Sequence, residues 1–500
     1  MSFTYNEQRA SVFQRRRTLN QTPLHTSTRR TYEQLRSVIR AGLATRSSNL
    51  EELTISQDFG ASRNSVRLAL AMLVQDGLIS RAPRRGTILT NHLVQFSIPH
   101  IPPRDYSPTP DQEADGLEVV SLQDGVIPTP RVIRKLLGTD ADFVLTFVQL
   151  GFAGDQPVFQ RTGVVPLHVE PAAFFERLHS LIGVSTPERK LPSDRYLAAR
   201  DEDFPGEFMT LFDAPFGATH NRVEALDADD QTAKLLQIEP GSPVLCRQQF
   251  TLDATGAVRE YTFTHFRGDR TTLADVRPVR STDVRRMPDR WIGRLDHELI
   301  ASVRPDETEP AEASQASAPV GAGRAVAPPR SHPRPATTSA VVSVPVDDHP
   351  EARVPGIVLT LVEHAIVPAS PLVRARMDID DDSVAMIEQI GFLDDKPMFV
   401  RVTYRRSTDL PGVIRVEGRL AAADGAPTVA GFEDRYGRPP GRSLTAIEAV
   451  RPDKRTATAM RVPEGTPMLV RELLLEDIDG VVRELSFTHF RSDRVAIEDD

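Results

Sequence analysis

Residues 258–270 read VREYTFTHFRGDR, and residues 482–494 read VRELSFTHFRSDR. The two stretches are identical at 10 of 13 positions and lie 224 residues apart. Upstream, GFAGDQPVFQR from Gly151 matches GFLDDKPMFVR from Gly391. A repeat of this length indicates two globular domains of one fold, rather than a solenoid of short units.

Each copy alternates apolar runs with short turns. In the first copy, residues 144–152 lead through a turn into a strand from Val158, and residues 244–252 lead into the VRE strand. The second copy repeats both patterns, and such pairs predict β-hairpins. Residues 171–181 and 229–236 have helical patterns. Each copy is therefore predicted to be an α+β domain with an antiparallel sheet.

A different pattern precedes the repeat, in residues 28–90. Apolar residues at helical spacing predict a first helix, residues 50–59 predict a short second one, and Ser62 is a good N-cap for a third. The apolar stripe of the third helix is predicted to comprise Val66, Leu70, Leu73 and Val74. Two short strands around residues 82–85 follow. This order predicts a winged helix-turn-helix.

The polar residues of this head suggest DNA binding. The first turn of the third helix is crowded with side chains that pair with base edges, and the wing is basic. The predicted DNA-binding residues are Arg63, Asn64, Ser65 and Arg67 on the helix and Arg84, Arg85, Gly86 and Thr87 in the wing. The alternative is a three-helix bundle that contacts protein.

Charge and composition divide the chain further. Residues 1–97 contain 14 Arg and 6 Asp or Glu, a net +8, although the whole chain carries -9. A basic head on an acidic body is typical of a protein whose head meets a polyanion. The predicted parts are a basic tail (1–27), a head (28–92), a linker (93–118), a first domain (119–283), an Ala/Pro/Ser-rich linker (284–350) and a second domain (351–500).

Several function classes are not expected. Cys246 is the single cysteine, so neither an internal disulfide nor a Cys/His zinc cluster is predicted. The chain contains no run of 18 apolar residues and no apolar signal segment at its beginning, which predicts a cytoplasmic protein without membrane contact. We identify no activated nucleophile, metal site or cofactor loop, and therefore expect no enzyme activity.

The head resembles the GntR family of bacterial regulators. The residues that carry the resemblance are Tyr32, Gly60–Arg63, Val66, Arg67, Ala69, Leu70, Leu73, Gly77–Ile79 and Arg85–Thr87. The resemblance implies a dimer on operator DNA, with DNA contacts from Arg63, Asn64, Ser65, Arg67 and the wing residue Gly86. Where the family has Leu-Pro-Ser-Glu-Arg at the opening of the second helix, this chain has Asn-Leu-Glu-Glu-Leu, residues 49–53. The DNA contact of that family arginine is therefore expected to be lost.

The repeated domains resemble the UTRA effector domain of the HutC-like branch, which has a chorismate-lyase-like fold. The resemblance places an effector near Glu260 and Glu484, but with Phe266 and Phe490 where the family often has Tyr. The family's two sugar-phosphate arginines are replaced by Gln149 and Gly151 in the first copy and by Gln389 and Gly391 in the second. Arg161 and Arg401 stand where an acid is common. A phosphosugar is therefore not expected.

Two interpretations of these arginines stay open. Arg161 with Glu260, and Arg401 with Glu484, either hold a carboxylate-bearing effector or form structural ion pairs. His265 and His489 are further effector candidates, although on an ideal strand they face away from the glutamates. The second copy either replaces a partner subunit's effector domain or serves dimerisation alone.

Taken together, the sequence predicts a transcriptional regulator, a repressor, whose operator binding is modulated by a small effector in the C-terminal domains. Its expected partners are double-stranded operator DNA, the effector and a second copy of the chain. The alternatives are a DNA-binding scaffold whose duplicated domains bind protein, and a lyase-like enzyme fused to a DNA-binding head.

Overall fold

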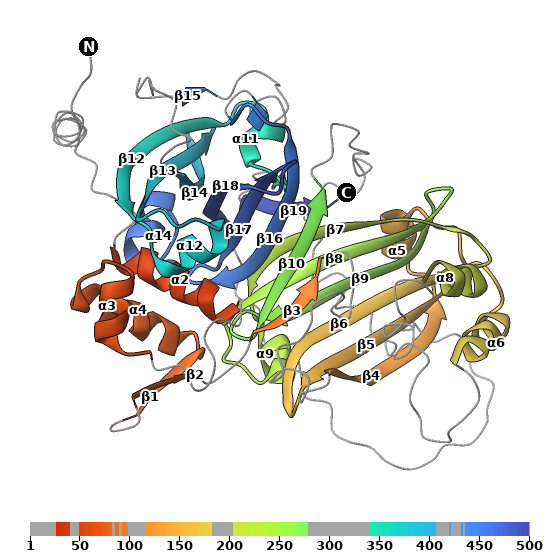
Figure 1. The fold of residues 1–500 in the computed structure, drawn as a ribbon. Helices are drawn as coiled ribbons and strands as arrows, with labels where there is room; N and C mark the ends of the chain where they lie inside the picture. The colour runs from red at the N-terminus through yellow and green to blue at the C-terminus, as the bar shows by residue number, and fades with distance from the viewer. Residues whose placement is uncertain are drawn as a thin grey trace.

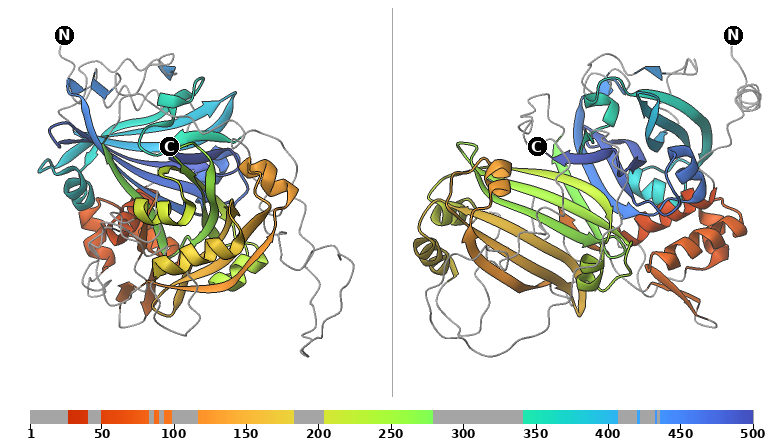
Figure 2. Two further views of the ribbon diagram at one scale, coloured as in Figure 1. Left: turned by 90° about the vertical axis from the view of Figure 1, so that its right-hand side faces the viewer. Right: turned by 180° about the vertical axis from the view of Figure 1, so that it is seen from behind.

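The structure is a computed structural model that describes residues 27–40, 50–82, 86–89, 93–98, 117–182, 204–278, 341–406, 420–421, 432–433 and 436–499. A small, mainly helical head lies at one end of two large antiparallel sheets (Figure 1). Views from two other sides show the head against the second sheet (Figure 2).

The head is a winged helix-turn-helix, as predicted. It comprises α2 (Ser27–Arg40), α3 (Glu52–Asp58), α4 (Arg63–Gln75), β1 (Ile79–Ala82) and β2 (Gly86–Leu89). Ser62 caps α4 by accepting a hydrogen bond from the Ser65 backbone N–H at 3.1 Å. The stripe of α4 differs from the prediction at one position, because Val74 is 40% exposed while Ala69 is fully buried.

The first copy forms a sheet whose strand order is β4-β5-β6-β9-β8-β7. The strands are β4 (Leu117–Pro128), β5 (Phe143–Ala153), β6 (Gln156–Leu167), β7 (Phe216–Asp227), β8 (Pro243–Asp253) and β9 (Val258–Arg267). The accompanying helices are α5 (Arg131–Leu137), α6 (Pro171–Ile182), α8 (Phe204–Phe212) and α9 (Asp230–Leu236). Both predicted hairpins, β5–β6 and β8–β9, are confirmed.

The second copy repeats this order as β12-β13-β14-β18-β17-β16, with β15 (Leu420–Ala421) beside β12. Its strands are β12 (Val358–Pro368), β13 (Ser383–Leu393), β14 (Lys396–Arg406), β16 (Pro440–Val450), β17 (Met468–Asp477) and β18 (Val482–Arg491). Its helices are α11 (Pro350–Arg353), α12 (Pro371–Met377) and α14 (Lys454–Met460). The equal strand order confirms the predicted duplication of one α+β fold.

The two copies exchange their C-terminal strands. β10 (Thr271–Pro278) follows the first copy in sequence but pairs with β16 of the second, with Leu273 opposite Ile447. β19 (Val495–Asp499) follows the second copy but pairs with β7 of the first, with Ile497 opposite Val223. In Figure 1, β10 accordingly lies beside the strands of the second sheet.

Each exchanged strand has a parallel neighbour that comes from a predicted linker. β3 (Val94–Ser97) pairs with β10, and β11 (Val342–Pro345) pairs with β19. Residues 94–97 and 342–345 thus belong to the sheets rather than to linkers, because their backbones pair with the outer edges of the exchanged strands. One core joins the domains, with Phe159, Phe266 and Ile497 in the same cluster as Phe399 and Phe490.

Candidate nucleic-acid interface and effector sites

The first turn of α4 presents polar side chains away from the head core. Arg63, Asn64 and Arg67 are exposed, and the side chain of Arg67 is 63% accessible. Ser65 is different, because it is buried and its hydroxyl lies 2.9 Å from that of Ser62. Three of the four predicted helix residues are therefore exposed, whereas Ser65 takes part in the N-cap of α4.

The predicted wing is the β1–β2 hairpin. Thr87 lies opposite Arg81 in the ladder and is buried, and Gly86 begins β2. Arg84 and Arg85 lie outside the described residues. The described part of the wing thus contributes the exposed Arg81 to the same surface as α4, a residue that the sequence analysis did not single out.

Glu52 is a second residue that the sequence analysis did not select. It begins α3, one position before the family's arginine site, and its carboxylate accepts a hydrogen bond from Arg81. Its other oxygen lies 3.7 Å from Nη2 of Arg67. The hydrogen bond from Arg81, with the charges of Arg81 and Arg67, lowers the pKa of Glu52, so the side chain is anionic at neutral pH. An acid thus links the recognition helix to the wing.

We expect Glu52→Gln to raise the affinity for operator and scrambled DNA alike, by about two- to fivefold at low salt. The substitution removes a negative charge from the surface that we expect to face phosphates, and it releases two arginines. Fluorescence anisotropy across a salt series measures the effect. Asp58→Asn, which removes an exposed charge from the other end of α3, is the matched control. Equal affinities of the two variants would contradict the expectation.

In the first UTRA-like copy, Arg161 and Glu260 meet as expected. Nη2 of Arg161 lies 2.9 Å from Oε1 of Glu260, and both side chains are buried. The guanidinium also lies over the Phe147 ring, 5.1 Å from its centroid. Burial raises the pKa of Glu260 although Arg161 lowers it. Burial, together with the charge of Arg161, lowers the pKa of Arg247 to about 9. The charges of two buried arginines, Arg161 and Arg247, therefore act on Glu260.

The second copy differs, and the expected pairing of Arg401 with Glu484 is wrong. Arg401 binds both carboxylate oxygens of Glu351 on α11, at 2.6 and 3.0 Å. Glu484 instead accepts a hydrogen bond from the Tyr436 hydroxyl at 2.6 Å and lies 3.0 Å from Nε2 of His349. The pairing differs from the prediction because α11 places the carboxylate of Glu351 beside Arg401. Burial raises the pKa of Glu351, but the charges of Arg401 and His349 together with hydrogen bonds lower it to about 2.

Packing leaves no room for a side chain at Gly151 and Gly391, the positions where the resemblance leads us to expect arginine. A Cβ atom on Gly151 would lie 2.1 Å from the Phe159 ring, and one on Gly391 would lie 2.3 Å from the Phe399 ring. Both rings are fully buried. A side chain at either glycine would therefore displace a core phenylalanine.

The two histidines lie apart from the glutamates. His489 Nε2 is 3.4 Å from Oε1 of Glu33 on α2, so this ring lies against the head. The His265 ring packs edge-on to Phe263 at 5.6 Å. Their alternation with Glu484 and Glu260 along β18 and β9 agrees with the predicted opposite faces. Their role in effector binding stays a prediction.

Among the described residues, no helix is both long and apolar enough to cross a membrane. Three solved structures are similar to parts of the chain. PhnF from Mycobacterium smegmatis is 18% identical, with 49% of this chain and 96% of that chain covered and a TM-score of 0.30. Its effector domain is 21% identical, with 31% and 96% covered and a TM-score of 0.27. The possible transcriptional regulator YydK from Bacillus subtilis is 12% identical, with 50% and 98% covered and a TM-score of 0.24.

Two family models match the sequence. The model described as "Bacterial regulatory proteins, gntR family" matches residues 27–89, which form the head. The model described as "UTRA domain" matches twice, at residues 167–272 and 357–496, one match in each copy. The chain therefore belongs to the GntR family of bacterial regulators, with one DNA-binding head and two UTRA domains.

Proposed function

We propose that this protein is a cytoplasmic repressor whose binding to operator DNA is modulated by a small acidic effector. The observation that carries the proposal is the exposed first turn of α4, where Arg63, Asn64 and Arg67 point away from a buried helix core. Arg and Asn in this position pair with guanine and adenine in the major groove.

An acidic effector is supported by the first UTRA domain. Burial and the charge of Arg161 lower the pKa of Arg247, so an added anion near these two arginines would be stabilised. In the second domain, Glu351 binds both terminal nitrogens of Arg401, whereas in the first domain Glu260 meets Nη2 of Arg161. We therefore propose the first domain as the effector site, with Arg161 and Glu260 as contacts, and a structural role for the second.

The strand exchange supports the idea that the second UTRA domain takes the place of a partner subunit's effector domain. Each domain supplies the strand that completes the other, so the pairing lies within one chain. A homodimer is then proposed for a different reason, because two chains would bring two heads to two operator half-sites.

The test is fluorescence anisotropy of the full-length protein on its own upstream intergenic DNA, against scrambled DNA, over a salt series. We expect Arg63→Ala to weaken specific binding by about tenfold to 100-fold, since one bidentate base contact is lost. Arg131→Ala is the matched control, because Arg131 is also the exposed first residue of a helix. If Arg63→Ala bound like the control, the proposed interface would be refuted.

A further inference from the structure

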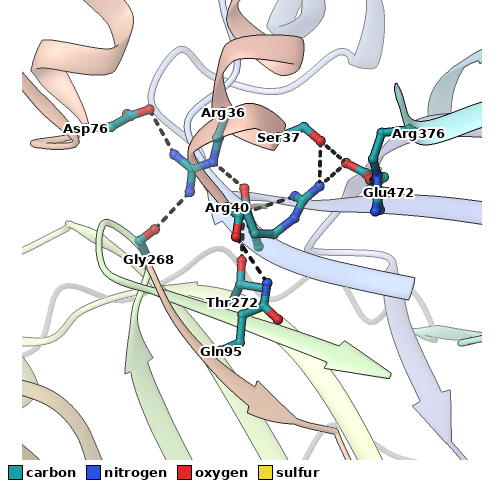
Figure 3. A network of polar contacts seen from close by, with 10 residues as sticks. Arg36, Ser37, Arg40, Asp76, Gln95, Gly268, Thr272, Arg376 and Glu472 are labelled. Carbon is teal, nitrogen blue, oxygen red and sulfur yellow. Dashed lines mark hydrogen bonds and ion pairs between the residues drawn. The ribbon is translucent and has the colours of Figure 1, made fainter. Parts of the chain in front are cut away.

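One face of α2 is buried against the second UTRA domain through its charged residues. Arg36 and Arg40 are 4% and 7% exposed, and Figure 3 shows them among polar groups of other elements, such as Gly268 and Glu472. In a helix that merely belongs to a free head, such residues would point into water. Here they reach two carboxylates of the effector domain.

Those carboxylates are Glu448 and Glu472, and both are almost fully buried. Glu448 forms ion pairs with Arg36 and Arg40 and accepts a hydrogen bond from the Thr272 hydroxyl at 2.6 Å. Burial raises the pKa of Glu448, but the charges of Arg36 and Arg40 and the hydrogen bonds from Thr272 and Arg36 together lower it below the ordinary value. The Glu448 carboxylate is therefore charged at every pH above the ordinary carboxyl pKa. Its contribution to the stability of the folded state is lost only as the pH falls through the lowered pKa.

Glu472 connects the head to a helix of the second domain. It forms an ion pair with Arg40, accepts a hydrogen bond from the Ser37 hydroxyl at 2.7 Å, and accepts another from Nε of Arg376 on α12 at 3.0 Å. Three elements, α2, α12 and β17, therefore meet at one buried carboxylate.

The first UTRA domain takes part through its exchanged strand. Thr272 lies in β10, and Nη2 of Arg36 donates to the carbonyl oxygen of Gly268 at 3.0 Å, just before that strand. Gln95 of β3 donates to the carbonyl oxygen of Arg40 at 3.3 Å. The head is thus bound at the junction where the two domains exchange strands.

Arg36 also contacts the end of the recognition helix. Nη1 of Arg36 lies 3.1 Å from Oδ2 of Asp76, the C-cap residue of α4. That oxygen also accepts a hydrogen bond from the Tyr32 hydroxyl at 2.6 Å. A continuous set of polar contacts therefore leads from Glu448 through Arg36 to α4.

The first domain lacks this arrangement at the equivalent positions, which lie 224 residues earlier on the strands. Glu224, the equivalent of Glu448, pairs with Arg222 of its own strand at 2.9 Å. Gln248 stands at the position of Glu472. The contacts to the head are therefore specific to the second copy. The fold itself accommodates glutamine at the position of Glu472, as Gln248 shows.

We propose that Arg36, Arg40, Glu448 and Glu472 form a latch that fixes the head on the strand-exchange junction and sets the orientation of α4 for the operator. Movement of β16 against β10 would then alter operator affinity. The part of this inference that concerns DNA rests on the proposed function, whereas the latch itself does not.

The latch is tested in the full chain by electron–electron distance measurements between spin labels at Gln57→Cys and Asp381→Cys. Both positions are exposed, whereas the native Cys246 is buried. We expect a narrow distance distribution in the wild-type background and a broad one after Glu448→Gln with Glu472→Gln. Arg40→Gln, which leaves the effector domains unaltered, should broaden it as well. Glu224→Gln is the matched control and should leave it narrow.

Operator affinity is measured on the same proteins. We expect the latch variants to bind at least about fivefold more weakly than Glu224→Gln, because a loosened head must be ordered on binding. An unchanged narrow distribution in both sets of latch variants would overturn the latch. A broad distribution with unchanged affinity would overturn its effect on DNA. If the wild-type protein bound no operator, the proposed function would fail, and the distances would still decide the latch.

Discussion

Replacing Ile497 with alanine is expected to destabilise the first UTRA domain, although Ile497 follows the second domain in sequence. Ile497 is 1% exposed, lies opposite Val223 of β7 and packs in the core shared by both domains. Loss of a buried isoleucine side chain in a packed core costs about 2 to 5 kcal/mol. Backbone amides of β7 should therefore exchange with deuterium faster than in the wild-type protein.

The reciprocal substitution is the control. Leu273→Ala removes the residue of β10 that lies opposite Ile447, so it should accelerate exchange in β16 instead. Mass spectrometry of the exchanged peptides distinguishes the two strands. If Ile497→Ala loosened β16 to β18 and left β7 protected, the strand exchange would be wrong.

Replacing Arg161 with methionine is expected to lower the stability of the first UTRA domain by about 3 to 5 kcal/mol, since it leaves Glu260 buried without its ion-pair partner. Burial already raises the pKa of Glu260, and the substitution should raise it further. A carboxyl group whose pKa is higher in the folded state stabilises at low pH, and this contribution is lost as the pH rises. The deficit should therefore be larger at pH 8 than at pH 5.

Differential scanning calorimetry at the two pH values measures this deficit. The double variant with Glu260→Leu removes the uncompensated carboxylate and should recover much of the stability, as replacements of whole buried ion pairs often do. A single variant as stable as the wild-type protein, or a deficit independent of pH, would count against the role of the pair.

The sequence predicted the elements of each domain but not how the domains combine. Alternating apolar residues identify a strand and the face it buries, and the β5–β6 and β8–β9 hairpins followed from this pattern. The pattern does not say which sheet a strand joins. β10 and β19 are equivalent strands of two related domains, so either sheet could accept either strand. β11 was missed because it is four residues long and lies in a Pro-rich segment.

The candidate sites were predictable to the extent that local patterns define them. Capping by Ser62 and the apolar stripe of α4 leave Arg63 and Arg67 on the outer face. Arg36 and Arg40, by contrast, have the spacing of an ordinary solvated helix face, and their burial depends on a domain more than 400 residues away. Glu351 could not be foreseen as the partner of Arg401, because a helix of four residues has no periodicity to detect.

The reciprocal exchange of β10 and β19 also constrains how the protein is made. During translation the first UTRA domain emerges early, but β19, which pairs with β7, leaves the ribosome only after the second domain. At ordinary rates of synthesis this interval is roughly 10 to 45 seconds. During it, β7 lacks the strand that completes it in the structure, and its edge can pair with β10 of its own chain or with another nascent chain. A stop codon before β19 would therefore leave the first UTRA domain without the native partner of β7 and open to aggregation. The first domain thus depends on synthesis of the second for its complete sheet.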